Sequence, residues 1–431
     1  MAITSKRIIL LNKKLIGIDS VNKVKLKWMR VDFSFNMGET MTENVIVFQG
    51  EKMILEYGGR NCWAFKEWIE ISFKLNGNVP SDIGFSNKRV LPVLSFMGSN
   101  ASGKTCAIRV LAFIKNFCFN SFSYSPDSNI PFDSFFGNND ESEFFISFCL
   151  PDSVDDEYTY ELSLNTRRVG SERLSKNEKL VFERKANEIA FDAFFNASTE
   201  VILRSNASFF STFFQYGIKA AEPFKALFEK IVTNVSYQGL FEGFPFDAPT
   251  YYHDNPIMLK RVVEELKRFD TGIEDITIQD TYDPNGKSTF IPLFLFKTAD
   301  GMKELPFMAQ SEGTKLLFSR LLDYFYVLDN GGLLAVDEID LHLHSNLVPM
   351  LIEYFNKPEN NPKQAQLVFT SHDSSLIDYL KKYSTYLFEK KNSESYCYRI
   401  DEIPNNIRIR NDRPLEPSYK SGVFGGVPRI G

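Results

Sequence analysis

The stretch that decides the fold of this chain is Gly98-Ser-Asn-Ala-Ser-Gly-Lys-Thr105. It matches the P-loop pattern G-x-x-x-x-G-K-[ST] without a gap. Residues 89–97 are mostly apolar and predict a short buried strand, and residues 105–119 carry apolar side chains at helical spacing. A strand, a glycine turn and a helix N-terminus direct backbone N–H groups and the helix dipole toward an anion. The sequence therefore predicts a phosphate-binding loop.

The side chains of this loop have distinct expected roles. Lys104 would reach the β- and γ-phosphates of a nucleotide, and the hydroxyl of Thr105 would hold Mg²⁺. The other residues expected to bind the nucleotide are Gly98, Asn100, Ala101, Ser102 and Gly103.

The composition is that of an ordinary globular protein. The chain has 431 residues, 43% of them hydrophobic and 24% charged, which is enough for two or three domains. It has no apolar run of the roughly 20 residues that a membrane span needs, and it does not begin with a signal peptide. The five cysteines are scattered without a C-x-x-C pair, which indicates reduced thiols in a cytosol. We therefore expect a cytoplasmic protein with no membrane partner.

Charge is unevenly distributed along the chain. The net charge of −6 argues against a general nucleic-acid binder. The first thirty residues, however, hold eight Lys or Arg residues against a single acid, Asp19. This block would touch nucleic acid or an acidic partner, or would be a solvated extension. A third interpretation places the true start at Met53, because Met53–Tyr57 resembles a first strand and residues 50–52 could be encoded by a ribosome-binding sequence.

The pattern divides the remaining chain into an α/β architecture. Residues 1–52 form the basic N-terminal extension, residues 53–194 a lobe with the P-loop and an antiparallel β-meander, residues 195–275 a helical insertion, and residues 276–431 a second lobe. Strands are expected at 53–57, 68–75, 144–150, 158–164, 179–184, 188–191, 276–280, 290–297 and 304–308, and helices at 223–232 and 256–269.

A second motif decides which kind of P-loop protein this is. Gly331-Gly-Leu-Leu-Ala-Val-Asp-Glu338 is an apolar strand that ends in two acids. Downstream of a P-loop, Asp337 would hold Mg²⁺ and Glu338 would polarise the attacking water. The alternative role for Asp337 is a helix cap.

Three further segments complete the pattern. Ser311-Glu-Gly-Thr-Lys315 precedes a helix predicted over 316–328, and a turn of this kind at a helix start is another anion site. Residues 367–373 form a strand that ends near His372, which would touch a γ-phosphate, and residues 340–344 directly follow the Asp-Glu pair.

In this order, the motifs resemble the ATP-binding-cassette (ABC) head of SMC-type and repair ATPases. Asp337-Glu-Ile-Asp-Leu-His-Leu-His344, Thr370-Ser-His-Asp373 and the tail 413–428 also look like bacterial AAA/ABC-type ATPases related to the RloA and OLD families. The resemblance implies a P-loop NTPase with an ABC/SMC-like head, an antiparallel β subdomain and an inserted helical subdomain. It implies the cofactors ATP and Mg²⁺.

The resemblance also implies roles for individual residues. His372 would sense the γ-phosphate, and Asp340 would lie at the seam of a homodimer or higher homo-oligomer. His342 and His344 would lie at the same seam rather than on a metal. The residues expected to contact the nucleotide of the second subunit are Ser311, Gly313 and Thr314. No Gln-loop can be assigned among Gln215, Gln238 and Gln310.

The functional expectation follows from this resemblance. The chain ends at Gly431 without the Toprim nuclease that OLD proteins carry. We therefore expect a cytosolic enzyme that hydrolyses ATP to ADP and phosphate, assembles around ATP and controls a separate effector, a toxin or a nuclease, in anti-phage defence. The alternative is a DNA-dependent SMC/OLD-like ATPase in DNA maintenance or repair. A transporter subunit would need a Leu-Ser-Gly-Gly-Gln signature, which differs from Ser311-Glu-Gly-Thr314.

Overall fold

The computed structural model divides into two compact units, Met1–Gly50 and Glu51–Gly431. In the first unit, β1 (Trp28–Ser34) and β2 (Thr40–Ile46) pair antiparallel. The prediction of a solvated extension did not include this hairpin, although Met29, Val31 and Phe33 alternate with polar residues as a strand requires. The residues that the structure describes are 28–34, 40–46, 53–75, 79, 89–150, 153–185, 188–191, 201–236, 239–240, 247–269, 271–282, 286, 288–404 and 413–427.

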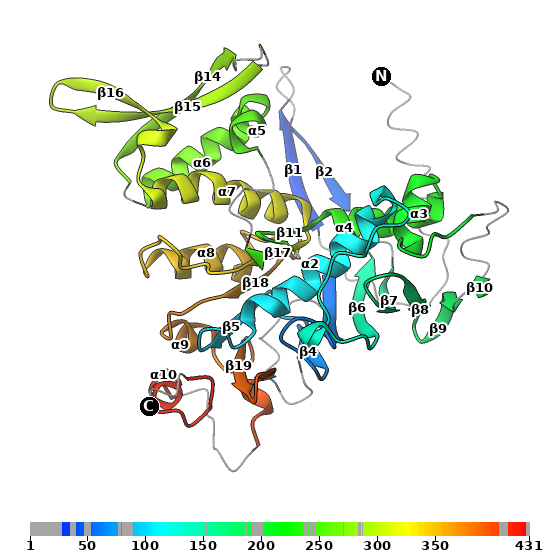
Figure 1. The fold of residues 1–431 in the computed structure, drawn as a ribbon. Helices are drawn as coiled ribbons and strands as arrows, with labels where there is room; N and C mark the ends of the chain where they lie inside the picture. Colours follow the sequence, from blue (N-terminus) through cyan, green and yellow to red (C-terminus); the bar gives the residue numbers. More distant parts are fainter. Residues whose placement is uncertain are drawn as a thin grey trace. The chain divides into compact units, whose positions relative to one another are not determined.

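The P-loop strand lies inside a six-stranded sheet of the second unit (Figure 1). Neighbouring strands run parallel, except for the antiparallel strand at one edge. The carboxyl ends of the parallel strands therefore meet at one edge of the sheet, where ligands bind in such folds. In spatial order the strands are β11 (Ile231–Thr233), β17 (Leu333–Val336), β18 (Gln366–Thr370), β5 (Val93–Gly98), β19 (Thr385–Lys391) and β20 (Glu394–Arg399).

The predicted meander forms a separate seven-stranded antiparallel sheet. One of its strands, β8, was missed from the sequence because its charged and polar residues hide the apolar alternation. In spatial order the strands are β10 (Glu188–Phe191), β9 (Lys179–Lys185), β8 (Val169–Lys176), β7 (Ser153–Leu164), β6 (Ser142–Leu150), β3 (Met53–Arg60) and β4 (Ile69–Ser72).

Two hydrophobic cores cover the two faces of the parallel sheet. Leu333 and Ala335 of β17 join one core, and Leu334 and Val336 join the other, as the period of two in a strand requires. Helix α2 (Lys104–Asn120) belongs to the first core together with the antiparallel sheet. The second core holds buried residues of α7 (Glu312–Asn330), α8 (Leu347–Asn356) and α9 (Leu376–Leu380). Both faces of β5 are therefore covered, which explains its continuous apolar sequence.

The segment predicted as a helical insertion is not purely helical. The helix predicted over 223–232 is present as α4 (Glu222–Glu229) but ends three residues early. Ile231 and Val232 belong instead to strand β11 of the P-loop sheet. These β-branched residues suit a buried strand next to β17. The other elements of this region are α3 (Phe209–Gln215), β12 (Val235–Ser236), β13 (Gly239–Leu240), α5 (Ala248–Asp254) and α6 (Pro256–Arg268).

A three-stranded antiparallel sheet follows α6 and confirms the three strands predicted in this region. Its buried residues Ile276 and Phe294 join the second core, where Phe294 packs edge-on against Phe318 of α7. This contact attaches the sheet to the helix that follows it in sequence. The strands are β14 (Ile273–Tyr282), β15 (Ser288–Thr298) and β16 (Gly301–Pro306).

Candidate functional site

The P-loop joins the end of β5 to the start of α2, as the sequence predicted. Gly103 caps the helix with φ of 106°, a left-handed conformation that favours glycine. The Lys104 ammonium is buried and donates hydrogen bonds to the carbonyl oxygens of Gly98 (2.8 Å) and Ser99 (3.0 Å). Burial lowers the pKa of Lys104, and the negative charges of nearby carboxylates oppose this shift. The loop thus holds a desolvated positive charge close to the backbone of its first two residues.

The carboxylate of Asp337, directly after β17, is held on both sides. Its Oδ2 accepts a hydrogen bond from the hydroxyl of Thr105 (2.8 Å), and its Oδ1 accepts one from the hydroxyl of Thr370 (2.7 Å). Thr370 ends β18, the strand between β5 and β17. The two residues predicted to hold Mg²⁺, Thr105 and Asp337, are therefore brought into direct contact from positions 232 residues apart.

Asn234 holds the backbone of Asp337 and was missed from the sequence. Its side-chain amide donates to the Asp337 carbonyl (3.0 Å) and accepts from the Asp337 N–H (2.8 Å). Asn234 is buried and directly follows the short strand β11. A polar residue directly after an apolar strand would have indicated a site residue at Asn234. Because residues 223–232 were predicted as a helix, that strand was not recognised.

Glu338 has a strained backbone at the position predicted for water activation. Its φ is 54°, which costs a non-glycine residue of the order of 1 kcal/mol or more. The Glu338 N–H donates to the Thr370 hydroxyl (2.7 Å), and this bond helps to hold the conformation. In the described part of the chain the Glu338 carboxylate has no hydrogen-bond partner, so its oxygens are available to a ligand or water. The alternative role of Asp337 as a helix cap is wrong, since α8 begins only at Leu347.

The segment after the Asp-Glu pair contacts the loop after β18 within the same chain. Asp340 Oδ2 accepts hydrogen bonds from the Ser371 hydroxyl (2.9 Å) and from the backbone N–H of His372 (3.0 Å). His372 itself is exposed. Asp340 thus positions the loop that carries His372.

The Ser311–Thr314 turn caps helix α7. Ser311 accepts a hydrogen bond from the Thr314 N–H (3.1 Å), and the two hydroxyls are 2.8 Å apart. A Cβ atom at Gly313 would lie only 2.7 Å from the His342 carbonyl, so glycine allows α7 to approach the segment after the Asp-Glu pair. Among the described residues, neither Ser311 nor Thr314 forms a hydrogen bond with the P-loop.

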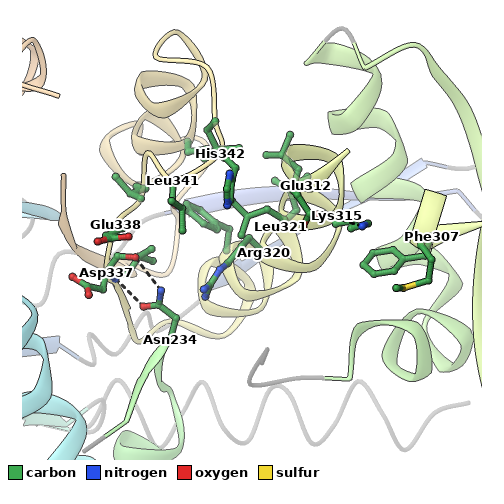
Figure 2. A pocket seen from close by; sticks show the side chains of 18 residues that line it. Asn234, Phe307, Glu312, Lys315, Arg320, Leu321, Asp337, Glu338, Leu341 and His342 are labelled. Carbon is green, nitrogen blue, oxygen red and sulfur yellow. Dashed lines mark hydrogen bonds and ion pairs between the residues drawn. The ribbon is translucent and has the colours of Figure 1, made fainter. Parts of the chain in front are cut away.

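A cavity of about 610 Å³ lies between α7 and the Asp-Glu pair (Figure 2). Asp337 and Glu338 lie at one end of it and Phe307 at the other, and Arg320 points into it from α7. Arg320 is 3.5 Å from the carboxylate of Asp323, which is 1% exposed. Burial raises the pKa of Asp323 to about 7, against the opposing charge of Arg320. Sequence reasoning gave no role to either residue.

The residues of the P-loop fit ATP and Mg²⁺. Ser102 Oγ is buried and has no hydrogen-bond partner in the described part of the chain. The Lys104 ammonium lies within ion-pair distance of no carboxylate among the same residues. Both groups suit a phosphate, while the oxygens of Thr105 and Asp337 are donors that Mg²⁺ accepts. In the described ranges, no cluster of three or more His, Cys, Asp and Glu residues forms another metal site.

The glutamines remain without an assigned role. Gln215 ends α3, and Gln310 donates hydrogen bonds to the carbonyl oxygens of Leu305 and Pro306. Gln238 lies outside the described residues. Within the described ranges, no hydrogen bond connects Gln215 or Gln310 with Asp337.

Comparison with known proteins identifies the family. A family profile described as "AAA domain, putative AbiEii toxin, Type IV TA system" matches residues 93–378, more than half of the chain. The chain belongs to this AAA domain family. The match starts at the first residue of β5 and ends within α9, so it includes the P-loop, the Asp-Glu pair and His372. The fold is that of a P-loop NTPase of mixed α/β architecture, with a parallel P-loop sheet and a separate antiparallel sheet, as the sequence predicted. No match to a curated protein was found.

Solved structures with similarity to this AAA domain protein include SMC heads. An SMC head bound to the C-winged helix domain of ScpA has 12% identity and a TM-score of 0.43, covering 80% of this chain and 97% of that chain. The SMC head domain from Thermotoga maritima has 12% identity and a TM-score of 0.37, covering 80% and 98%. An SMC head with an extended coiled coil, bound to a ScpA domain and derived from Pyrococcus furiosus, has 12% identity and a TM-score of 0.41, covering 86% and 98%.

Within the described residues, no helix of this AAA domain protein combines the length and the apolar character that a membrane crossing requires.

Proposed function

We propose that this AAA domain protein binds and hydrolyses ATP and that ATP-dependent self-association controls a separate effector protein. The observation that carries the proposal is the contact of Thr105 with Asp337 beside the buried ammonium of Lys104. This combination of a cation, a hydroxyl and a carboxylate at a P-loop suits a nucleoside triphosphate with Mg²⁺.

Each residue then has a defined task in hydrolysis. Lys104 binds the phosphates, and Thr105 and Asp337 hold Mg²⁺, which neutralises charge on the phosphate oxygens. Glu338 orients the attacking water with its carboxylate, while the hydrogen bond from its backbone N–H to Thr370 holds the backbone of Glu338 in place. His372 senses the terminal phosphate. The backbone of residues 98–103 completes the phosphate-binding loop.

The second subunit supplies the remaining contacts in this proposal. Ser311, Gly313 and Thr314 start the long helix α7, and the N-terminus of a helix attracts phosphate. Because Ser311 and Thr314 form no hydrogen bond with the described P-loop of their own chain, they would bind the nucleotide of a second copy. Asp340 would lie at the seam between the two copies. The complex would be a homodimer or a higher homo-oligomer.

Control of a separate effector is the finer part of the proposal. Each of the two hydrophobic cores of the unit Glu51–Gly431 includes residues of the P-loop sheet, so both cores belong to the ATPase fold. We therefore propose that the effector is a separate protein. The family description names a putative toxin and a toxin–antitoxin system, which supports a functional link between this family and a toxin. The cytosolic role, the nuclease as an alternative effector and the place in anti-phage defence are further parts of our proposal. The basic residues among the first thirty favour a second candidate, a DNA-dependent ATPase in DNA maintenance or repair.

The deciding experiment measures the native mass of Glu338→Gln with and without ATP and Mg²⁺, co-expressed with the products of neighbouring genes. This variant should keep ATP but cleave it slowly, so it should accumulate as an ATP-dependent dimer or larger assembly that carries a partner. An unchanged mass without a partner would contradict the proposal. Hydrolysis stimulated by DNA, with a stimulation that falls as salt rises, would favour the DNA-dependent alternative.

A further inference from the structure

The C-terminal strap, residues 413–427, is packed as part of the fold. Leu415, Tyr419 and Phe424 are buried in the second core. The strap contains the short helix α10 (Glu416–Lys420). Its buried side chains fix the course of the backbone, so the polar residues between them have defined positions.

Hydrogen bonds tie the strap to the strands and loops around the P-loop. Glu416 Oε1 accepts a bond from the hydroxyl of Ser374, two residues after His372 (2.7 Å). The Tyr398 hydroxyl donates to the Phe424 carbonyl (2.6 Å). The strap is therefore attached directly to the loop that carries His372.

The strap also lines one part of an open cavity of about 680 Å³ beside the first half of the P-loop. This cavity is distinct from the one between α7 and the Asp-Glu pair. Three groups of residues line it: Met97, Gly98, Ser99 and Asn100 from β5 and the P-loop, Ser371, His372 and Ser374 from the next loop, and Tyr419, Lys420 and Val427 from the strap.

Lys420 is the residue of this cavity that carries a full positive charge. Its ammonium is 2.8 Å from Glu416 Oε1, the same oxygen that binds Ser374, and its side chain is 64% exposed. A lysine on a flexible four-carbon stem can leave such an exposed ion pair at little cost. Lys104 donates to the carbonyl oxygens of Gly98 and Ser99 from the start of α2, and Lys420 lines the cavity beside the same two residues from the strap, so the two cations approach this part of the loop from different elements.

We propose that Lys420 is a second cationic ligand for the terminal phosphate of the nucleotide and leaves Glu416 to bind it. This inference rests on the proposed function, since it requires a nucleotide in the P-loop. Lys420 shares its cavity with His372 and with the loop backbone at Gly98–Asn100. Because ADP lacks the γ-phosphate, which is the terminal phosphate of ATP, Lys420 would distinguish ATP from ADP.

The test compares nucleotide affinities of purified full-length variants by calorimetry, with Mg²⁺ and either ADP or the non-hydrolysable β,γ-imido analogue of ATP. Lys420→Ala should weaken binding of the ATP analogue by about tenfold, the effect of one charge-assisted hydrogen bond, and leave ADP binding unchanged. Lys420→Arg should retain most of the affinity. Lys357→Ala is the matched control, because Lys357 forms the same i,i+4 ion pair, with Glu353 on α8 at 3.1 Å, and does not line this cavity.

Each other outcome has a definite meaning. If Lys420→Ala binds the ATP analogue as well as wild type does, or loses ADP affinity equally, the inference is wrong. Lys104→Ala separates this failure from failure of the proposed function, since it should lose both nucleotides whatever Lys420 does. A thermal unfolding midpoint equal to that of Lys357→Ala would establish that a loss of affinity in Lys420→Ala is not a loss of folding.

Discussion

At the scale of single residues, the site depends on the two hydroxyls that hold Asp337. Thr105 and Thr370 come from different segments and each binds one carboxylate oxygen. Thr370 has a second task, because it also accepts the N–H of Glu338 (2.7 Å). One threonine therefore positions both the proposed metal ligand and the proposed water-orienting residue.

Thr370→Val should impair hydrolysis more than nucleotide binding. Valine keeps the shape of threonine but leaves a backbone N–H and a carboxylate oxygen without their partner. We expect turnover at saturating Mg²⁺ to fall by about tenfold or more, while ADP affinity without Mg²⁺ stays unchanged. Thr385→Val, which removes a buried hydroxyl bonded to the Lys381 carbonyl (3.0 Å), is the control and should leave turnover unaffected. Equal losses in the two variants would contradict a positioning role.

Lys104→Ala should abolish nucleotide binding. Lys104 is 7% exposed as a whole residue and its ammonium donates hydrogen bonds to loop carbonyls, so no other described group replaces its charge inside the loop. Titration with a fluorescent ATP analogue measures this directly. Near-normal hydrolysis by Lys104→Ala would refute the assignment of the P-loop.

Asp323 should make stability depend on pH. Burial raises its pKa from 3.8 to about 7, so between these values the folded chain keeps a proton that the unfolded chain has lost. The contribution of Asp323 to the free energy of unfolding is thus complete below pH 3.8 and falls as pH rises to 7, by at most about 1.4 kcal/mol per pH unit. Asp323→Asn removes this dependence.

The measurement is the difference in melting temperature between Asp323→Asn and wild type across this pH range. The melting temperature of Asp323→Asn should rise relative to that of wild type as pH increases, and the difference should then become constant. Asp329→Asn on the same helix, where Asp329 pairs with Arg261 at the surface (2.8 Å), is the control. A difference for Asp323→Asn that does not change with pH would contradict the assigned pKa.

At the scale of elements, sequence reasoning succeeded where a periodic pattern carried a motif. The strand, loop and helix around the P-loop formed as expected, although β5 begins at Val93 rather than 89, directly after Pro92. The sequence pattern predicted the wrong element where contact with a strand distant in sequence decides the structure. Ile231 and Val232 continue a helical pattern but pair with β17, which lies about one hundred residues further along the chain. No local signal contains that pairing.

Strand β8 was missed for a related reason. Its central residue Glu172 is fully buried, where it accepts hydrogen bonds from the Tyr160 hydroxyl (2.6 Å) and the Phe209 N–H (2.9 Å). Glu172 also lies 3.5 Å from Arg184 of the neighbouring strand. A charged residue in the middle of a short segment normally indicates that the segment is exposed. Only the folded sheet supplies the hydrogen-bond and ion-pair partners that allow Glu172 to be buried.

Arg184→Met should destabilise the antiparallel sheet strongly. It leaves the buried carboxylate of Glu172 without its positive partner, and breaking a buried pair in this way costs about 3–5 kcal/mol. Arg173→Met is the matched control, because Arg173 forms an exposed pair with Glu161 across the same sheet (3.6 Å) and should cost less than about 1 kcal/mol. Urea unfolding followed by circular dichroism measures both. Similar midpoints for the two variants would refute the buried pair.

At the scale of the whole molecule, charge separates the first residues from the rest. The chain carries −6 in total, and its first thirty residues hold eight basic side chains and one acid. Residues 31–431 therefore carry −13. Residues 31–50 account for −3 of this through Asp32, Glu39 and Glu43, so the P-loop unit Glu51–Gly431 carries −10 by itself and is acidic. An acidic surface repels nucleic acid, and any affinity for DNA should reside in the basic block. This distribution lets one deletion separate the two functional candidates.

Removing residues 1–50 should leave the P-loop unit intact. Glu51–Gly431 is a compact unit with its own two cores, so its melting temperature and its ATP-dependent association should equal those of the full chain. If DNA controls the ATPase, the full chain should bind DNA with a steep salt dependence and be stimulated by it, and the deletion should abolish both. If the protein instead controls an effector, DNA should not change the rate of ATP hydrolysis by the full chain or by the deletion variant. Both proteins should then retain the same partner in a native-mass measurement. A deletion that unfolds the P-loop unit would contradict its independence, and light scattering with circular dichroism would detect that directly.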